Sequence, residues 1–168
     1  MKVKHIDHLN LSVRSFAETA AWYERVFGFA VVEDGIYDGR PWGVLRSGDA
    51  MLCAYEDPSR RCPDGEDLKA RGLHGVNHFA LRIVDPDKWE EIVRRENIEV
   101  FYGGAYRWPH STAWYIKDPT GYTIEVAHWD DDTPIFGSRN AMALIATCAE
   151  QKDARSVVGF AGIRMRWL

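Results

Sequence analysis

Residues 4–13 alternate between polar and apolar side chains, in the order KHIDHLNLSV. A period of two residues is typical of a strand with one buried and one exposed face. We expect Leu9, Leu11 and Val13 on the buried face. The polar face then carries three residues: His8, Asn10 and Ser12.

An amphipathic helix is expected directly after this strand. Ser15 and Glu18 form a capping-box pattern at its start, and Gly28 is a natural stop. Between them apolar residues recur at helical spacing: Phe16, Ala20, Tyr23 and Phe27. Three further strands are predicted, at 29–33, 42–46 and 50–55, because glycine-containing turns separate these apolar runs.

The opening pattern returns 70 residues later, where GVNHFALRI at 75–83 aligns with residues 5–13. His78 therefore corresponds to His8. A second helix is expected to begin at Asp85 and Pro86, an N-cap residue followed by proline. Strands are predicted after it, at 99–102, 113–117 and 122–128. The chain is thus predicted to be an internal duplication of a βαβββ unit.

The last two strands form a predicted hairpin, WYIKDPTGYTIEV at 114–126, whose turn contains Pro119 and Gly121. In the second strand, Glu125 shares one face with Thr123 and Ala127, opposite the apolar face. A carboxylate in this position requires solvent, a cation or a metal ion, because burial of an unpaired charge is very costly.

Four segments follow from these patterns. Residues 1–56 form the first module, 57–72 a polar linker, 73–128 the second module and 129–168 a C-terminal extension without a counterpart in the first module. Within the extension, 140–151 suits a short helix and 157–168 a last strand. We expect it to pack over the domain or across a dimer interface. The predicted fold is one α+β domain of two tandem modules that form a cup-shaped mixed sheet.

Composition narrows the function classes. Hydrophobic residues make up 46% and charged residues 27% of the chain, as in ordinary soluble proteins. A net charge of −4 argues against a nucleic-acid partner, and no apolar run reaches transmembrane length. No signal-peptide pattern opens the chain, and three cysteines without C-x-x-C spacing favour reduced thiols. We therefore expect a cytoplasmic protein with no membrane partner. Its expected partners are a small-molecule substrate and a second copy in a homodimer.

The duplication brings three candidate metal ligands into one register. His8 and His78 occupy equivalent positions on the polar faces of their strands, and Glu125 lies on the corresponding face of the last strand. Two imidazoles and one carboxylate can form a facial triad, which leaves positions on a divalent metal open for substrate or oxygen. A single such histidine is more often hydrogen-bonded to backbone in the core. The shared register favours the metal site.

Three segments resemble the signature segments of the vicinal oxygen chelate superfamily: DHLNLSV, GVNHFAL and DPTGYTIEV. The resemblance covers residues 4–128. This superfamily includes glyoxalase I, type I extradiol dioxygenases, methylmalonyl-CoA epimerase, fosfomycin-resistance enzymes and bleomycin-binding proteins. The resemblance implies paired modules that curl around a metal ion, with His8, His78 and Glu125 as its ligands.

The branches of this superfamily differ in a fourth ligand. Glyoxalases and epimerases carry a carboxylate near the end of the first module's last strand, whereas this chain has Leu52, Cys53 and Ala54 there. That difference counts against an isomerase. Bleomycin-type binders lack the metal triad, so the triad counts against a protein that only sequesters its ligand.

A tyrosine at the position of Tyr115 is shared by extradiol and fosfomycin-type enzymes. Its phenol could donate to a developing oxyanion near the metal, and packing within the hairpin is the alternative. Extradiol enzymes also carry a catalytic histidine nine residues earlier. Here that position is Tyr106, a difference that counts against ring cleavage. The nearest histidine is His110, which becomes the candidate general acid or base, with a surface histidine as the alternative.

Further residues are candidates for substrate binding. Asn10 and Arg82 share the polar faces with the two histidines, and Arg82 could bind a substrate carboxylate or phosphate or pair within the structure. The segment 102–111 is aromatic, which favours an aromatic or apolar substrate. The expected substrate wall comprises Trp42, Tyr106 and Trp108.

The leading hypothesis is an Fe²⁺ enzyme, with Mn²⁺ as second choice, that cleaves a catechol-like aromatic with oxygen. The metal would act as Lewis acid and template, assisted by Tyr115 and His110. One alternative is a glyoxalase- or epimerase-like lyase or isomerase. Another is a metal-free protein that binds a hydrophobic drug or metabolite in a stacking pocket of Trp42, Tyr106, Trp108 and Trp114.

Overall fold

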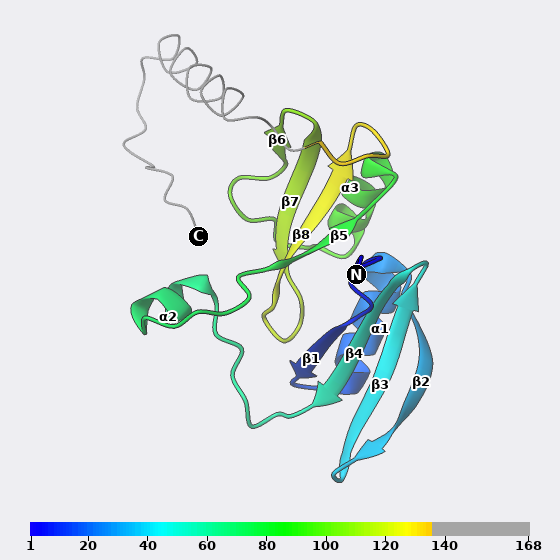
Figure 1. The fold of residues 1–168 in the computed structure, drawn as a ribbon, viewed down its shortest axis with the longest axis vertical. Coiled ribbons are helices and arrows are strands. Elements are labelled where there is room, and N and C mark those ends of the chain that lie inside the picture. The colour runs from blue at the N-terminus through cyan, green and yellow to red at the C-terminus, as the bar shows by residue number, and fades with distance from the viewer. Residues whose placement is uncertain (136–168) are drawn as a thin grey trace.

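Two βαβββ modules follow one another in the chain, as the repeat predicts (Figure 1). The structure is a computed structural model and describes residues 1–135. The first module contains β1 (Leu9–Val13), α1 (Phe16–Phe27), β2 (Ala30–Tyr37), β3 (Arg40–Ser47) and β4 (Ala50–Glu56). The second contains β5 (Phe79–Arg82), α3 (Pro86–Arg95), β6 (Tyr106–Trp108), β7 (Ser111–Lys117) and β8 (Thr123–Trp129), and the linker carries the short helix α2 (Gly65–Ala70).

Each module builds its own four-stranded mixed sheet. The strand orders are β1-β4-β3-β2 and β5-β8-β7-β6, so β1 and β5 are both edge strands. β1 runs parallel to β4, and β5 runs parallel to β8, while the remaining pairs are antiparallel. The α+β class and the tandem modules are therefore confirmed. Within one chain the two sheets stay separate.

The helices begin and end where their capping residues predict. The Ser15 side chain accepts a hydrogen bond from the Glu18 backbone N–H, and Gly28 ends α1 with a left-handed φ of 67°. In α3 the Asp85 side chain caps the Lys88 N–H, and proline occupies the first turn.

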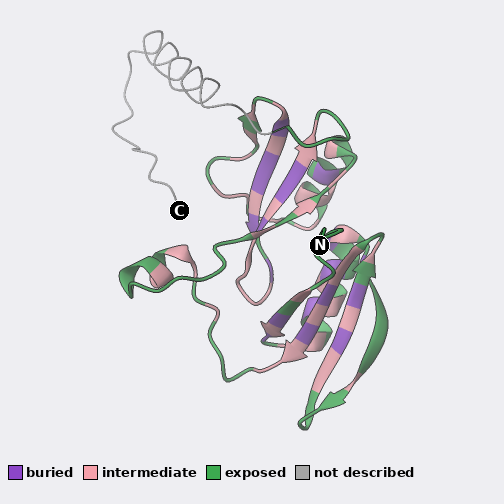
Figure 2. Ribbon diagram, viewed as in Figure 1, coloured by how far each residue is buried: buried purple, intermediate pink, exposed green. Residues whose placement is uncertain are grey.

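One hydrophobic core serves both modules. Apolar residues from the helix-facing sides of both sheets meet there: Val13, Leu45, Leu52, Ile116, Ile124 and Val126. The ring of Phe27 on α1 stacks on Trp89 on α3 with centroids 5.5 Å apart, and Trp89 also contacts Trp114 on β7. Figure 2 shows buried positions alternating with exposed or partly exposed ones along the strands. The other faces of the two sheets, here called the front faces, point away from this shared core.

The turn between β7 and β8 fixes the second module against the first. The buried Asp118 carboxylate accepts hydrogen bonds from the Gly121 and Tyr122 N–H groups, at 2.8 and 2.9 Å, and from the Tyr23 hydroxyl of α1 at 3.2 Å. The Tyr122 hydroxyl donates to the Ser12 carbonyl at 3.1 Å. Burial raises the pKa of Asp118, although the two backbone N–H groups favour its ionised form.

Three sequence predictions need correction. The strand predicted at 99–102 is wrong: the strand beside β7 is β6. Within 99–102, the Phe101 N–H donates to the Tyr115 carbonyl at 2.8 Å, and the Phe101 carbonyl accepts from the Gly104 N–H at 3.4 Å. The first strand begins at Leu9, because residues 4–8 have no ladder partner. β2 extends to Tyr37, because it pairs with β3 from Ala30 to Tyr37, with a register shift between Val31 and Glu33.

Other expectations lie outside the described residues. These are the helix at 140–151 and the strand at 157–168 of the C-terminal extension. None of the helices within residues 1–135 is long and apolar enough to cross a membrane.

Candidate metal centre

Two of the three predicted metal ligands lie together on the front face of the second sheet. His78 Nε2 is 3.0 Å from Glu125 Oε2. His78 directly precedes β5, and Glu125 lies on β8 opposite Ala80, so the parallel pairing brings the two side chains to the same place. Their side chains are 38% and 21% exposed, so an ion can reach both from solvent.

Tyr115 completes this cluster. It pairs with Glu125 across the β7–β8 ladder, and its hydroxyl is hydrogen-bonded to that carboxylate. Burial, and then the Glu125 charge, raise the pKa of Tyr115 to about 12. Its ring contacts the His78 ring edge-on, with centroids 5.6 Å apart, and the Tyr102 ring edge-on, with centroids 5.4 Å apart. We call His78, Glu125 and Tyr115 the half-site.

The third predicted ligand lies elsewhere in the same chain. His8 precedes β1 on the front face of the first sheet, where its Nδ1 is 2.8 Å from Asp7 Oδ2 and its side chain is 45% exposed. No three His, Cys, Asp or Glu residues within 1–135 converge on one point that could hold a metal ion. The chain therefore presents its predicted ligands on two separate faces.

The donor atoms of the half-site suit a divalent transition-metal ion. An imidazole nitrogen and a carboxylate oxygen, already within contact distance, are donors that Fe²⁺, Mn²⁺ and Zn²⁺ share. Two protein donors are one fewer than the three of a facial triad. His78 and Glu125 therefore fit a divalent metal ion as two of its ligands.

The strand register identifies the residue that corresponds to Glu125 in the first module. Glu125 lies opposite Ala80, and Cys53 lies opposite Asn10 in the equivalent β1–β4 pair. A thiol thus occupies the front-face position where the second module has a carboxylate. Burial, followed by the charges of Asp7 and Glu33, raises the pKa of Cys53.

Two of the predicted substrate residues lie on the front face of the first sheet. Asn10 is exposed on β1 and lines a depression of about 470 Å³ beside Tyr37 and Tyr55. Trp42 stacks on Tyr55 with ring centroids 5.6 Å apart and an angle of 14° between the rings. His8, Asn10 and these rings share one surface.

The others belong to the second sheet. The Arg82 guanidinium donates to the backbone carbonyls of Asp131 and Asp132, at 2.8 and 2.7 Å, so it is already engaged within the chain. Tyr106 and Trp108 lie on β6, with ring centroids 4.8 Å apart, in the same front-facing register as Tyr115.

Two predicted residues are not brought to the half-site. His110 lies in the turn between β6 and β7, five residues before Tyr115, which is about 17 Å along an extended strand. Trp114 has the opposite side-chain direction to Tyr115 and is only 4% exposed, packed in the core against Trp89. It cannot line a front-face stacking pocket.

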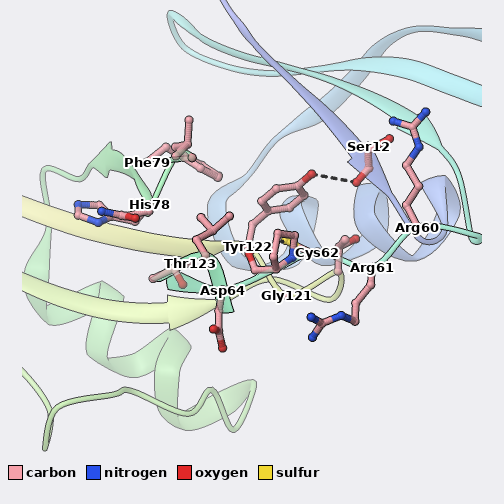
Figure 3. Close-up of a pocket in the computed structure, with 16 residues that line it drawn as sticks. Ser12, Arg60, Arg61, Cys62, Asp64, His78, Phe79, Gly121, Tyr122 and Thr123 are labelled. Atoms are coloured by element: carbon pink, nitrogen blue, oxygen red, sulfur yellow. Dashed lines mark hydrogen bonds between the residues drawn. The ribbon is translucent and has the colours of Figure 1, made fainter. Parts of the chain in front are cut away.

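A cavity of about 310 Å³ adjoins the half-site (Figure 3). His78 and Phe79 border one side of it, and Cys62 of the linker and Tyr122 of the β7–β8 turn border the other. A small molecule in this cavity would lie beside a candidate metal ligand.

Sequence reasoning missed two residues of this region. One is Tyr102, which falls within the predicted strand at 99–102 but lies in a loop against Tyr115. The other is Asp118 in the predicted turn, whose carboxylate joins the two modules. The Asp-Pro-Thr-Gly pattern, with its side-chain acceptor ahead of a turn, was the available signal for Asp118.

Comparison with known proteins gives a family match. The model of the Glyoxalase/Bleomycin resistance protein/Dioxygenase superfamily matches residues 5–126, which span both modules. No curated protein sequence matches significantly.

Solved structures share the fold. A glyoxylase/bleomycin resistance protein/dioxygenase domain from Frankia sp. EAN1pec is 13% identical, with a TM-score of 0.64 over 79% of this chain and 96% of its own. Lactoylglutathione lyase from Agrobacterium tumefaciens is 26% identical, with a TM-score of 0.55 over 76% of this chain and 96% of its own. The fosfomycin resistance protein FosX from Listeria monocytogenes, in complex with Mn(II), is 13% identical, with a TM-score of 0.58 over 84% of this chain and 99% of its own.

Proposed function

Since the chain belongs to the Glyoxalase/Bleomycin resistance protein/Dioxygenase superfamily, we propose that it is a divalent-metal-dependent enzyme whose metal site is shared between two copies of the chain. The observation that carries this proposal is the 3.0 Å approach of His78 and Glu125 on a sheet face that His8 of the same chain does not reach. A second copy would supply the missing imidazole.

The open edges of the sheets support this assembly. β1 and β5 each have one neighbour in their sheets, and the segments 1–8 and 73–78 that precede them are exposed. A two-fold axis that places β1 of one copy beside β5 of the other would bring His8 to His78 and Glu125. Because a two-fold contact is reciprocal, two equivalent sites would form.

The chain's own residues suit chemistry on two adjacent substrate oxygens. The ion, when bound, would supply Lewis-acid activation of both oxygens. Tyr115 keeps its proton at neutral pH, since its pKa is raised to about 12, and it can donate a hydrogen bond to an oxygen that becomes negative beside Glu125. Asn10 and Trp42 of the first sheet would face the same substrate from the other copy.

Within this class we propose oxygen-dependent cleavage of a catechol-like aromatic, with Fe²⁺ as the ion and Mn²⁺ as the second choice. The front-face aromatic rings of both sheets support a planar substrate: Tyr37, Trp42, Tyr55, Tyr102, Tyr106 and Trp108. The position of His110 gives it no contact with the half-site, so Tyr115 is the residue to which we assign proton donation.

A lyase or isomerase is the second candidate. It is favoured by the 26% identity to a lactoylglutathione lyase, although Cys53 stands where that branch carries a carboxylate as the fourth ligand. In that case the same half-site would hold the ion, and the substrate would rearrange without oxygen.

Metal analysis separates the enzyme proposals from a metal-free binding protein. Protein purified without chelator is expected to carry a divalent ion, and His8→Ala should lose it, whereas His5→Ala on the same exposed segment should keep it. Equal traces of metal in all three proteins would contradict the enzyme proposals. Oxygen uptake with a panel of catechols then tests the reaction: no uptake by fully Fe²⁺-loaded protein would favour the lyase or isomerase.

A further inference from the structure

Tyr102 has a backbone conformation that is unfavourable for its side chain. Its φ is 58°, and it is followed by Gly103 and Gly104 with φ values of 81° and 111°. A left-handed backbone is easily adopted by glycine, but it is a genuine outlier for a bulky aromatic residue. Strain of this kind persists only where the surrounding structure over-determines it, and it gathers at functional sites.

Burial does not explain the presence of an aromatic ring at this position. Tyr102 is 66% exposed, so its ring contributes little to the core. The neighbouring residue already anchors the loop: the Phe101 N–H donates to the Tyr115 carbonyl at 2.8 Å, and Lys117 lies over the Phe101 ring at 5.6 Å. Glycine would satisfy this loop at least as well as tyrosine.

The Tyr102 ring contacts the ring of Tyr115 edge-on, with centroids 5.4 Å apart and an angle of 82° between the planes. His78 meets Tyr115 in the same way, at 5.6 Å and 89°. The Tyr115 ring therefore contacts both a candidate metal ligand and Tyr102, with its hydroxyl hydrogen-bonded to Glu125.

We propose that Tyr102 is a positioning residue of the half-site, whose ring keeps the Tyr115 phenol on Glu125 and whose strained backbone serves that contact. The contact limits rotation of the Tyr115 side chain towards solvent, so the proton donor stays at the carboxylate before a substrate arrives. This inference rests on the proposed function, because the position of the Tyr115 proton donor matters only if the half-site binds a metal ion. The contact between Tyr102 and Tyr115 can itself be tested in the metal-free protein.

The experiment compares Tyr102→Gly with Tyr102→Phe in the full-length, metal-free protein. Glycine removes the ring and suits the left-handed backbone, whereas phenylalanine keeps both the ring and the strain. All proteins are labelled with 3-fluorotyrosine, and the ¹⁹F signal of Tyr115 is assigned by its loss in Tyr115→Phe. The midpoint of thermal unfolding is measured on the same samples.

We expect Tyr102→Gly to unfold at the wild-type temperature or above it, while its Tyr115 signal moves towards that of a solvent-exposed tyrosine. Tyr102→Phe should retain the wild-type Tyr115 signal. The proposal is overturned if the Tyr115 signal is unchanged in Tyr102→Gly, if that variant unfolds at a lower temperature, or if Tyr102→Phe loses the signal as well. Mn²⁺ binding by the wild-type protein is measured separately. A wild-type protein that binds no Mn²⁺ would contradict the proposed function, whatever the ¹⁹F result for Tyr102.

Discussion

His78 and Glu125 come within 3.0 Å of each other because the parallel pairing of β5 and β8 aligns a residue at the start of one strand with the middle of the other. The same pairing in the first module brings Asn10 opposite Cys53. The internal duplication thus creates two equivalent places on two front faces, and only one of them carries a carboxylate.

Replacement of Cys53 tests this equivalence. Cys53→Glu would add a carboxylate at the position that matches Glu125, and in the shared site it would provide a fourth ligand. We expect Mn²⁺ to bind at least about 10-fold more tightly than to wild type, as measured by isothermal titration calorimetry. Cys53→Gln has the same size without the charge and should show no gain. Equal affinities for the two variants would show that Cys53 does not face the ion.

The raised pKa of Tyr115 predicts a pH dependence of stability. The folded chain keeps the Tyr115 proton up to about pH 12, whereas the unfolded chain releases it near pH 10. The contribution of the Tyr115 proton to the free energy of unfolding is complete below pH 10, and it is lost as the pH rises from 10 to about 12. Urea unfolding of Tyr115→Phe should therefore show a smaller loss of free energy over this interval than wild type. Parallel curves for both proteins would contradict the raised pKa of Tyr115, to which burial contributes most and the Glu125 charge second.

Asp118 provides a second test of the interface between the modules. Asp118→Ala leaves the Gly121 and Tyr122 N–H groups without their acceptor and should cost about 1–3 kcal/mol in the free energy of unfolding. Asp118→Asn keeps an acceptor without the buried charge. Because burial raises the pKa of Asp118, ionisation above pH 4 destabilises the wild-type fold, and that loss should be absent from Asp118→Asn. Equal destabilisation by both variants would contradict this account.

Trp89 should be a large contributor to stability, since it lies between Phe27 and Trp114 and is 2% exposed. Trp89→Ala should cost about 3–5 kcal/mol in denaturant unfolding. Its indole N–H has no hydrogen-bond partner in the described part of the chain. Trp89→Phe therefore loses no hydrogen bond and should cost much less than Trp89→Ala. A cost for Trp89→Phe close to that of Trp89→Ala would assign a role to the N–H.

The sequence predicted the modules well because their patterns are local. Alternation identified the front and back faces of β1 and β8, and the caps at Ser15 and Asp85 identified where the helices begin. The incorrect prediction of a strand at 99–102 also has a local cause. Its β-forming residues are followed by Gly103 and Gly104, whose left-handed backbones turn the chain before it can pair with β7 as a ladder.

The site was predictable only in part. Register across the repeat predicted that His8, His78 and Glu125 converge, and within one chain the structure brings His78 and Glu125 together without His8. That His8 lies on another face depends on how Phe27, Trp89 and the Asp118 turn pack the modules back to back. Such contacts between distant segments leave no periodic pattern in a single sequence.

The shared metal site is tested most directly by mixing two inactive variants. His8→Ala and His78→Ala carry different purification tags, are refolded together, and the heterodimer is isolated through both tags. In it, His8 of one copy meets His78 and Glu125 of the other at one of the two sites. We predict one divalent ion per heterodimer and none in either variant alone. A heterodimer without metal, or no heterodimer at all, would contradict a site shared between two copies.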